Sequence, residues 1–475
     1  MGIQLANRGS SSNRILDYPA GSRLRVYGFW ILDFGIDPTN QSGGLLEFTN
    51  SGFDCIVLSK FRTRLCFRNP RFLIPNMSSK RILFISNGHG EDNHTSHVIQ
   101  TLRQLCPSVE MAAMPIVGEG KAYRNLNIPI IGPTQRMPSG GFFYMRRLYL
   151  LKDFQSGLIG LTWRQLQAVL HYAPDCDLIM ATGDFISQTF AYLTKRPFVS
   201  FISCLSALYE GKLRLNPLLW HDLNSSQCLT VFTRDAYTAG DLQRQGITKA
   251  KFGGIPALDW LVPTGKNLDL KPNVPAIALL PGSRMPEAAR NFRLQLQLVL
   301  EIAKVASGQE LQFYAALVPD LMQELDDIAK SQSWQHEQGL LTYASAGGSP
   351  VEVRCYSDAF SDIVCYSTLV IGMAGLAVDL AVAIGKPVIQ IPGEGPQFTY
   401  QFAEAQTRLL GINAQTIGTK PATPEILKQA AQRSIETLQD AEYLAKCKEN
   451  GPKRFGPPGA SDRIARFLLT HLGEN

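Results

Sequence analysis

The sequence predicts an α/β protein in which two Rossmann-like domains, each built on a parallel sheet, face each other across a cleft. Short and almost wholly apolar runs alternate with helical patterns, which is typical of buried parallel strands joined by crossover helices. The chain has 475 residues, which is long for one hydrophobic core and indicates two or three domains. Its hydrophobic fraction of 45% and charged fraction of 18% are those of a globular protein.

The first 76 residues depart from this pattern. They combine Gly and Ser turns with isolated aromatic residues and eight arginines, without sustained periodicity or a secretory signal. Since the run after Met77 is typical of a first strand, we interpret residues 1–76 as an irregular extension, with a mis-assigned start preferred to a transit peptide. Residues 77–475 carry 37 basic and 35 acidic residues, a net charge of +2 against +6 for the whole chain. This small positive net charge therefore gives no support to nucleic-acid binding.

Residues 77–263 are expected to form the first domain. A glycine-rich loop at residues 86–92 follows its first strand, and the next helix is expected at Thr95–Leu105. His94 and His97 are expected on an exposed face of that helix. The strands are predicted at the apolar runs Arg81–Ile85, Asp177–Ala181, Phe198–Ile202 and Cys228–Phe232.

Residues 264–275, rich in Gly, Pro, Asn and Lys, predict a linker, and residues 276–455 predict the second domain. Its first strand stops at a Pro-Gly turn, and a helical pattern follows. Backbone N–H groups at a helix start favour an anion, and an arginine adds a fork of donors suited to phosphate. Gly282, Ser283 and Arg284 are therefore candidate phosphate-binding residues. The alternative is an ordinary strand-to-helix turn with an arginine in solvent.

A second strand–turn–helix unit follows the same plan. An apolar strand ends at Gly372, the turn continues to Gly375, and Asp379 lies about one turn inside the next helix. A carboxylate there can accept hydrogen bonds from a ribose diol; the alternative is a surface aspartate on a half-buried helix. Gln397 and Gln401 follow the next strand. Because ligands of open α/β sheets bind at the carboxyl ends of the strands, these loops are expected to converge.

These motifs resemble lipid-A-disaccharide synthase. They are more distantly similar to other two-domain GT-B glycosyltransferases that use UDP-sugars, and they resemble in particular the lipid-A-disaccharide synthase-related group of photosynthetic bacteria and plastids. The resemblance extends from about Lys80 to the end of the chain. The family usually places Glu where Asp379 stands. The resemblance is carried by Leu279–Arg284, the glycine turn before Asp379, the run Gly385–Val388 and the loop that contains Gln397.

The resemblance implies a GT-B glycosyltransferase that moves a sugar from a UDP-sugar to a membrane-associated lipid or glycolipid. It implies an acceptor-binding first domain, a nucleotide-sugar-binding second domain and a C-terminal helix in residues 456–475 that crosses back to the first domain. It also implies a protein that associates peripherally with the membrane. The nine scattered cysteines, an odd number, indicate reduced thiols in a cytoplasmic setting. We expect no cofactor and no metal. No Asp-x-Asp motif stands at a suitable strand end, and the nine cysteines form no C-x-x-C pair.

The catalytic base is expected in the first domain. Asp184 follows a predicted strand, and Asp184-Phe185 resembles a pair that is implicated in catalysis in the family. A partly dehydrated carboxylate beside an aromatic ring has a raised pKa, which suits a base. The alternative role for Asp184 is an N-cap of the helix that follows. His89 and Asp92, in the first glycine-rich loop, are the second and third candidates.

A segment rich in aromatic and basic residues is the candidate contact with the acceptor or membrane. Two interpretations stay open: an interfacial helix, or a core helix whose basic side chains extend to water. The nearly uncharged run 363–385 is assigned to a strand, a turn and a helix, and not to a membrane span. The residues of the candidate contact are Phe142, Phe143, Tyr144, Arg146 and Arg147.

Two other functions stay open. UDP-GlcNAc 2-epimerases share the two-domain architecture and would use Arg284 and a helical acid on a soluble sugar. A non-catalytic protein that binds a nucleotide or a lipid is the remaining alternative, because Asp379 departs from the family's Glu.

Overall fold

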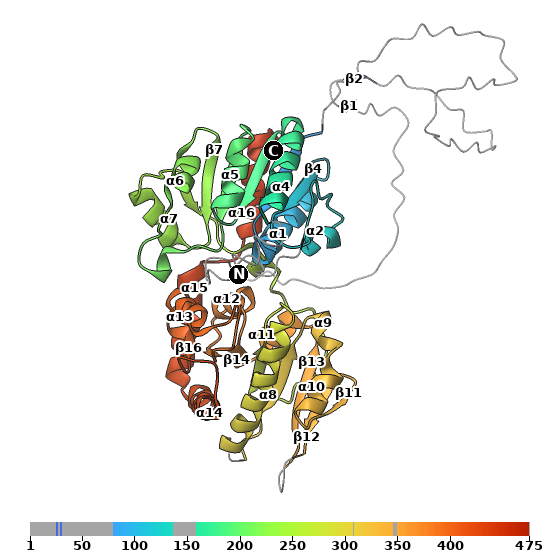
Figure 1. Ribbon diagram of the computed structural model, residues 1–475, viewed down its shortest axis with the longest axis vertical. Helices are drawn as coiled ribbons and strands as arrows, with labels where there is room; N and C mark the ends of the chain where they lie inside the picture. Colours follow the sequence, from blue (N-terminus) through green and yellow to red (C-terminus); the bar gives the residue numbers. More distant parts are fainter. Residues whose placement is uncertain are drawn as a thin grey trace, which may run out of the picture. The chain divides into compact units, whose positions relative to one another are not determined.

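The computed structural model describes residues 25–26, 29–30, 79–135, 158–306, 308–344 and 349–474. The chain divides into two units, Met1–Ile74 and Pro75–Asn475. In the first unit, β1 (Arg25–Val26) and β2 (Phe29–Trp30) pair as antiparallel strands. In the second unit, we call residues 79–263 the N-lobe and residues 264–455 the C-lobe (Figure 1).

The N-lobe is built on a six-stranded parallel sheet with the order β4-β3-β5-β6-β7-β8. Its central strands are buried on both faces, which explains their continuous apolar sequences. The strands are β3 (Arg81–Ser86), β4 (Glu110–Pro115), β5 (Leu178–Thr182), β6 (Phe198–Ile202), β7 (Cys228–Thr233) and β8 (Ala250–Phe252). The helices are α1 (His89–Leu105), α2 (Lys121–Asn125), α4 (Leu158–Tyr172), α5 (Phe185–Leu193), α6 (Pro217–Asn224) and α7 (Ala236–Arg244), with 3-10 turns η1 (Ala173–Asp175), η2 (Ala207–Tyr209) and η3 (Pro256–Trp260).

The C-lobe is built on an eight-stranded sheet with the order β11-β12-β13-β10-β9-β14-β15-β16. Six strands run parallel, and β11 and β12 add an antiparallel edge that the sequence analysis did not predict. The strands are β9 (Ala276–Leu280), β10 (Gln312–Ala316), β11 (Gln335–Glu337), β12 (Leu340–Tyr343), β13 (Val351–Tyr356), β14 (Leu369–Gly372), β15 (Val388–Gln390) and β16 (Ala414–Thr416). The helices are α8 (Glu287–Val305), α9 (Pro319–Met322), α10 (Leu325–Ser331), α11 (Phe360–Tyr366), α12 (Leu376–Ala383), α13 (Tyr400–Leu410), α14 (Pro424–Gln439) and α15 (Ala441–Phe455), with η4 (Gly411–Asn413).

The predicted fold class, two Rossmann-like domains, is confirmed by these two sheets. Among the parallel strands of each sheet, the strand order reverses between β3 and β5 in the N-lobe and between β9 and β14 in the C-lobe. Such reversals are the places where ligands of open α/β sheets bind. The run 363–385 contains β14, a turn and α12, as the sequence analysis assigned it, but it begins in α11, which was not predicted.

Helix α16 (Ala460–Leu472) returns from the C-lobe and packs in the N-lobe (Figure 1). Ile464 and Leu468 are fully buried in one apolar cluster with Val98 and Ile99 of α1. The carboxylate of Asp259 accepts hydrogen bonds from the backbone N–H groups of Gly459 (2.5 Å) and Ser461 (2.6 Å), so the start of α16 is fixed to the end of the N-lobe.

The segment between the lobes is held against the C-lobe. The Asp362 carboxylate of α11 accepts hydrogen bonds from the Thr264 hydroxyl (2.8 Å) and from the Gly265 N–H group (2.9 Å). Leu268 is buried in the C-lobe core. The predicted linker therefore follows the surface of the C-lobe as an ordered connection.

Candidate functional site

The loops after β9 and β14 meet at the strand-order reversal of the C-lobe. Gly282 has φ 99°, and a Cβ atom at this position would lie 3.1 Å from the carbonyl oxygen of Met373. The amide of Asn291 on α8 donates to the carbonyl of Pro281 at 3.0 Å. Because β9 and β14 are neighbours, their carboxyl ends bring Gly282 and Gly372 to one edge of the sheet, as expected from the sequence.

Gln397 joins this group from the loop after β15. A Cβ atom at Gly375 would lie 3.6 Å from the side-chain nitrogen of Gln397, so the Gln397 amide faces the start of α12. Ser283 is exposed and Arg284 is half-buried. A Met285–Pro286 turn follows Arg284, so α8 begins at Glu287 and not directly after the glycine turn. Gln401 is an exposed residue in the first turn of α13.

Asp379 is buried, with 6% of its surface exposed, so its alternative role as a surface aspartate is wrong. One carboxylate oxygen accepts a hydrogen bond from Nη2 of Arg234 at 2.7 Å. The other accepts one from Nε2 of Gln406 at 2.9 Å. Gln406 in turn accepts a hydrogen bond from Gln390 at 2.7 Å. The predicted ribose-binding acid thus stands in a buried polar network that also contains an N-lobe arginine.

Arg234, at the end of β7, is the main site residue that the sequence analysis missed. Its guanidinium donates to the carbonyl of Ser203 at 3.2 Å and lies 5.4 Å from the ring centre of Phe455. Burial disfavours its charge, but the negative charges and hydrogen-bond acceptors around it, Asp379 foremost, together outweigh that effect and raise the pKa of Arg234. The signal in the sequence is an arginine directly after an apolar strand, followed by the helix-capping Asp235.

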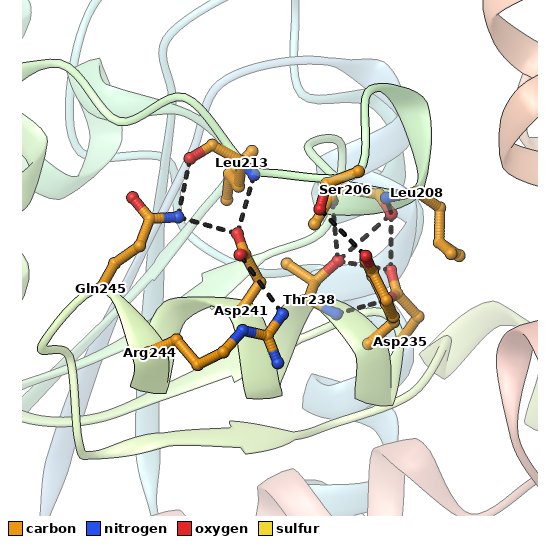
Figure 2. Close-up of polar contacts among 11 residues, drawn as sticks. Ser206, Leu208, Leu213, Asp235, Thr238, Asp241, Arg244 and Gln245 are labelled. Carbon is orange, nitrogen blue, oxygen red and sulfur yellow. Dashed lines mark hydrogen bonds and ion pairs between the residues drawn. The ribbon is translucent and has the colours of Figure 1, made fainter.

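The segment after β6 is fixed by the polar face of α7 (Figure 2). The Asp235 carboxylate accepts hydrogen bonds from the Ser206 hydroxyl (2.8 Å) and from the Thr238 N–H group (2.7 Å). Farther along α7, Asp241 accepts a hydrogen bond from the N–H group of Leu213 at 2.8 Å. Two residues of this anchored segment, Leu208 and Tyr209, pack against the apolar core of the C-lobe. The segment and Arg234 are therefore N-lobe contacts to the part of the C-lobe around Asp379, as are Ile255 and Leu258, which are buried in the same core.

Asp184 lies at the strand-order reversal of the N-lobe and is the N-cap of α5. Its carboxylate accepts a hydrogen bond from the N–H group of Ile186 at 3.1 Å, so the capping role is confirmed. Burial, reinforced by the negative charge of Glu91, raises the pKa of Asp184 to about 6. Asp184 can cap the helix and also act as a base, because capping uses only one of its two carboxylate oxygens.

Glu91 is a second residue that the sequence analysis did not select. A Cβ atom at Gly183 would lie 3.3 Å from Cγ of Glu91, so this side chain stands beside the strand end that carries Asp184. The thiol of Cys204 lies close by: burial raises its pKa, and the charges of Glu91 and Asp184 add to that effect. Arg234 also acts on this thiol, in the opposite direction. Cys204 therefore lies near Glu91 and Asp184 and also near Arg234.

His89 and Asp92 lie in the first turns of α1 and not in a loop, because the helix begins six residues earlier than predicted. His89 is exposed, and its ring lies against Gly118, where a Cβ atom would be 2.6 Å from Cε1. Asp92 is only 1% exposed and accepts a hydrogen bond from the Ser86 hydroxyl at 2.5 Å. Burial raises the pKa of Asp92 to about 8. The Asp92 side chain is therefore enclosed, and its expected catalytic role stays a prediction.

The expected exposed positions of His94 and His97 are wrong. His94 is buried with its ring edge-on to Phe201, and burial lowers its pKa to about 3. His97 stacks on the Trp260 ring at 5.4 Å, and burial lowers its pKa as well. Both are neutral packing residues at pH 7. The inner face of α1 is therefore wider than the sequence analysis predicted, because it includes both histidines.

The candidate membrane contacts, Phe142, Phe143, Tyr144, Arg146 and Arg147, lie outside the described residues. The helix that follows them, α4, exposes Ile159 (66%), Trp163 (59%) and Leu170 (40%). Within the described ranges, no helix is long and apolar enough to cross a bilayer. The same residues contain no group of three or more His, Cys, Asp or Glu side chains that could hold a metal ion.

No protein-family model and no curated protein matches the chain. Solved structures do match. A protein described as a UDP-N-acetylglucosamine 2-epimerase from Listeria monocytogenes has a TM-score of 0.54 and 15% identity, over 84% of this chain and 98% of its own. MnaA from S. aureus, solved with UDP, has a TM-score of 0.52 and 14% identity, over 83% and 97%. The spinosyn rhamnosyltransferase SpnG, solved with thymidine diphosphate, has a TM-score of 0.51 and 12% identity, over 82% and 99%. These likenesses establish the fold, two Rossmann-like domains of the GT-B type.

Proposed function

We propose that the protein is a glycosyltransferase that moves a sugar from a UDP-sugar to a membrane-associated lipid or glycolipid. The observation that carries the proposal is the meeting of the β9 and β14 loops, with Gly282 and Gly372 at the strand-order reversal of the C-lobe. The GT-B fold, shared with proteins solved with UDP and thymidine diphosphate, supports a nucleotide diphosphate as the ligand of these loops.

In this proposal, the donor diphosphate binds beside Arg284 and the start of α12. The guanidinium and the backbone N–H groups after Gly282 and Gly375 stabilise the negative charge that develops as the diphosphate leaves. Asp379 accepts a hydrogen bond from a ribose hydroxyl. Each of its carboxylate oxygens has two lone pairs and accepts one hydrogen bond from the protein, so each can accept a second. Gln397 contributes its amide from the loop after β15. Ser283, in the loop after β9, and Gln401, in the first turn of α13, remain secondary candidates.

The acceptor hydroxyl attacks the anomeric carbon of the donor sugar. The new carbon–oxygen bond forms as the bond to the diphosphate breaks, and the hydroxyl proton passes to Asp184, whose pKa of about 6 suits a base near neutral pH. His89, exposed at the same end of the N-lobe sheet, is the second candidate for this role. The apolar side chains that α4 exposes support a lipid acceptor and a membrane surface as partners.

A UDP-release assay with candidate UDP-sugars and lipid extracts tests the proposal. We expect release that depends on lipid, that falls at least a hundredfold in Asp184→Asn and that is lost in Arg284→Ala. Unchanged UDP affinity in Arg284→Ala would contradict the placement of the diphosphate.

The likeness to a protein described as a 2-epimerase favours one second candidate, an epimerase that acts on a soluble UDP-sugar. Such an enzyme needs no lipid. Conversion of a UDP-sugar to its C2 epimer in the absence of lipid, followed by nuclear magnetic resonance, would decide for it. Binding of UDP without release or epimerisation would instead indicate a non-catalytic nucleotide-binding protein.

A further inference from the structure

Helix α8 carries a row of polar side chains that contact the main chain of two loops and of the end of strand β14. Glu287 contacts the loop after β15, Asn291 the loop after β9, and Gln295 the end of β14, where its amide donates to the Ile371 carbonyl at 3.1 Å. These positions are four residues apart and therefore lie on one face of the helix. All three side chains are buried. A polar face on the inner side of a helix needs a reason, because burying polar groups is costly unless each is paired.

Glu287 makes the densest of these contacts. Its carboxylate accepts hydrogen bonds from the N–H group of Gln397 at 3.0 and 3.1 Å and from that of Phe398 at 2.7 Å. It is 5% exposed. One turn on, Nη2 of Arg290 donates to the Gly395 carbonyl at 2.7 Å. A carboxylate and a guanidinium from adjacent turns of α8 thus hold the two sides of one short loop.

The loop at residues 393–398 closes on itself. The N–H group of Gly393 donates to the carbonyl of Phe398 at 2.9 Å, and the Glu287 carboxylate serves the N–H groups at the closing end. A Cβ atom at Gly393 would lie 2.8 Å from the side-chain oxygen of Asn291, so the loop also presses directly on α8. Moving this loop away from α8 would break charge-assisted hydrogen bonds that no other group on the helix replaces.

The position of this loop decides where Gln397 lies. Its backbone N–H group is bound by Glu287, and its side-chain amide faces Gly375 at the start of α12. We propose that Glu287 is a positioning residue for the donor: by binding the backbone of Gln397 and Phe398, it sets the distance between the Gln397 amide and the glycine turn that holds the diphosphate. This inference rests on the proposed function above, and it adds a residue that does not itself touch the donor.

A purely structural role for Glu287 is the alternative. An acidic residue in the first turn of a helix is favourable in itself, because it complements the helix dipole. That role would be served equally by an exposed carboxylate and would leave UDP binding unchanged. Affinity for UDP and exchange of the loop amides therefore separate the two roles.

The test measures UDP binding by titration calorimetry and amide hydrogen exchange of the peptide that contains residues 393–399, on the full-length protein. In Glu287→Ala, we expect at least a tenfold loss of UDP affinity and faster exchange at Gln397 and Phe398. Glu287→Gln keeps one acceptor oxygen, so it should restore most of both. Glu301→Gln, an ion-paired residue toward the other end of α8, is the control and should match the wild type.

Arg290→Ala provides a second test if Glu287→Ala does not fold, because this side chain is partly exposed. Its loss removes the hydrogen bond to Gly395 and the ion pair with Glu394 from the loop and leaves the Glu287 contacts in place. It should weaken UDP binding severalfold and speed exchange of the same peptide. Unchanged UDP affinity in a Glu287→Ala protein whose loop amides exchange faster would overturn the inference, as would unchanged exchange. If the wild type binds no UDP, the proposed function is wrong. Amide hydrogen exchange then still tests whether Glu287 holds the loop.

Discussion

At the scale of single residues, burial separates side chains that look equivalent in the sequence. Asp92 and Asp184 each follow a glycine within a few residues of a strand end, but Asp92 is enclosed and Asp184 is half-buried beside Glu91. The pKa values of about 8 and about 6 follow from that difference. Only the second carboxylate is both ionised near neutral pH and close to the surface.

Asp184→Asn isolates the base from the helix cap, because asparagine caps a helix as well as aspartate does. We expect the fold to persist and kcat to fall by about a hundredfold or more. In the wild type, the active form is the carboxylate, so kcat/KM should rise with pH through about 6 and then level off. A pH profile from 4.5 to 8 measures this, and a flat profile below pH 6 would contradict the assignment.

Asp92→Asn tests the buried carboxyl group by stability. The folded-state pKa of about 8 lies above the usual value near 4, so the folded protein holds this proton while the unfolded chain releases it. This group therefore destabilises the fold progressively as the pH rises from about 4 to 8. Chemical unfolding of Asp92→Asn should lack that part of the pH dependence and show greater stability than the wild type at pH 8. A folded Asp92→Asn protein without activity would instead support the catalytic role predicted for Asp92.

At the scale of elements, two helices use polar faces to fix the loops of the site. Helix α7 binds the segment after β6 through Asp235, Thr238 and Asp241, and α8 binds the C-lobe loops through Glu287 and Asn291. Both helices begin just after a strand, so their first turns lie at the carboxyl edge of a sheet. Loops at that edge carry the backbone groups that need partners, which explains why these two helices depart from the usual apolar inner face.

Asp241→Ala tests the anchoring by α7. It leaves the buried N–H group of Leu213 without its acceptor, which should lower the free energy of unfolding by about 1–3 kcal/mol. Exchange of the Leu213 amide should become faster. Arg244→Ala, on the next turn of α7 and 62% exposed, is the matched control and should change stability by less than about 0.5 kcal/mol (Figure 2). Equal losses of unfolding free energy in the two variants would show that the Leu213 hydrogen bond contributes no more to stability than the exposed Arg244 side chain does.

At the scale of the molecule, a buried ion pair and a returning helix connect the N-lobe and the C-lobe. Arg234 and Asp379 are 145 positions apart in the sequence and meet at 2.7 Å, and α16 completes the N-lobe core after the C-lobe has ended. A buried pair adds little stability compared with an apolar contact, but breaking it leaves one charge without compensation. Because Asp379 is the proposed ribose-binding residue, this pair connects the proposed donor site directly to the contact between the lobes.

A double-mutant cycle on Arg234 and Asp379 measures this link. Either Arg234→Ala or Asp379→Ala should lower the free energy of unfolding by about 3–5 kcal/mol, and the double variant should be less destabilised than the sum of the two. Asp462 and Arg466, an exposed pair on α16, form the control cycle, with a coupling of about 0.5 kcal/mol or less. Additive losses at Arg234 and Asp379 would show that the two charges act independently.

The sequence by itself determined the two parallel sheets, because continuous apolar runs between helical patterns are typical of strands that helices cover on both faces. It also located the loops after β9 and β14, since a strand that stops on glycine before a helix is a local pattern. The tertiary structure alone decided that Asp379 meets Arg234, that Asp92 and His94 are enclosed, and that Glu287 holds a loop more than a hundred residues away. These outcomes depend on how distant elements pack, and burial and pairing are properties of that packing that no local pattern contains.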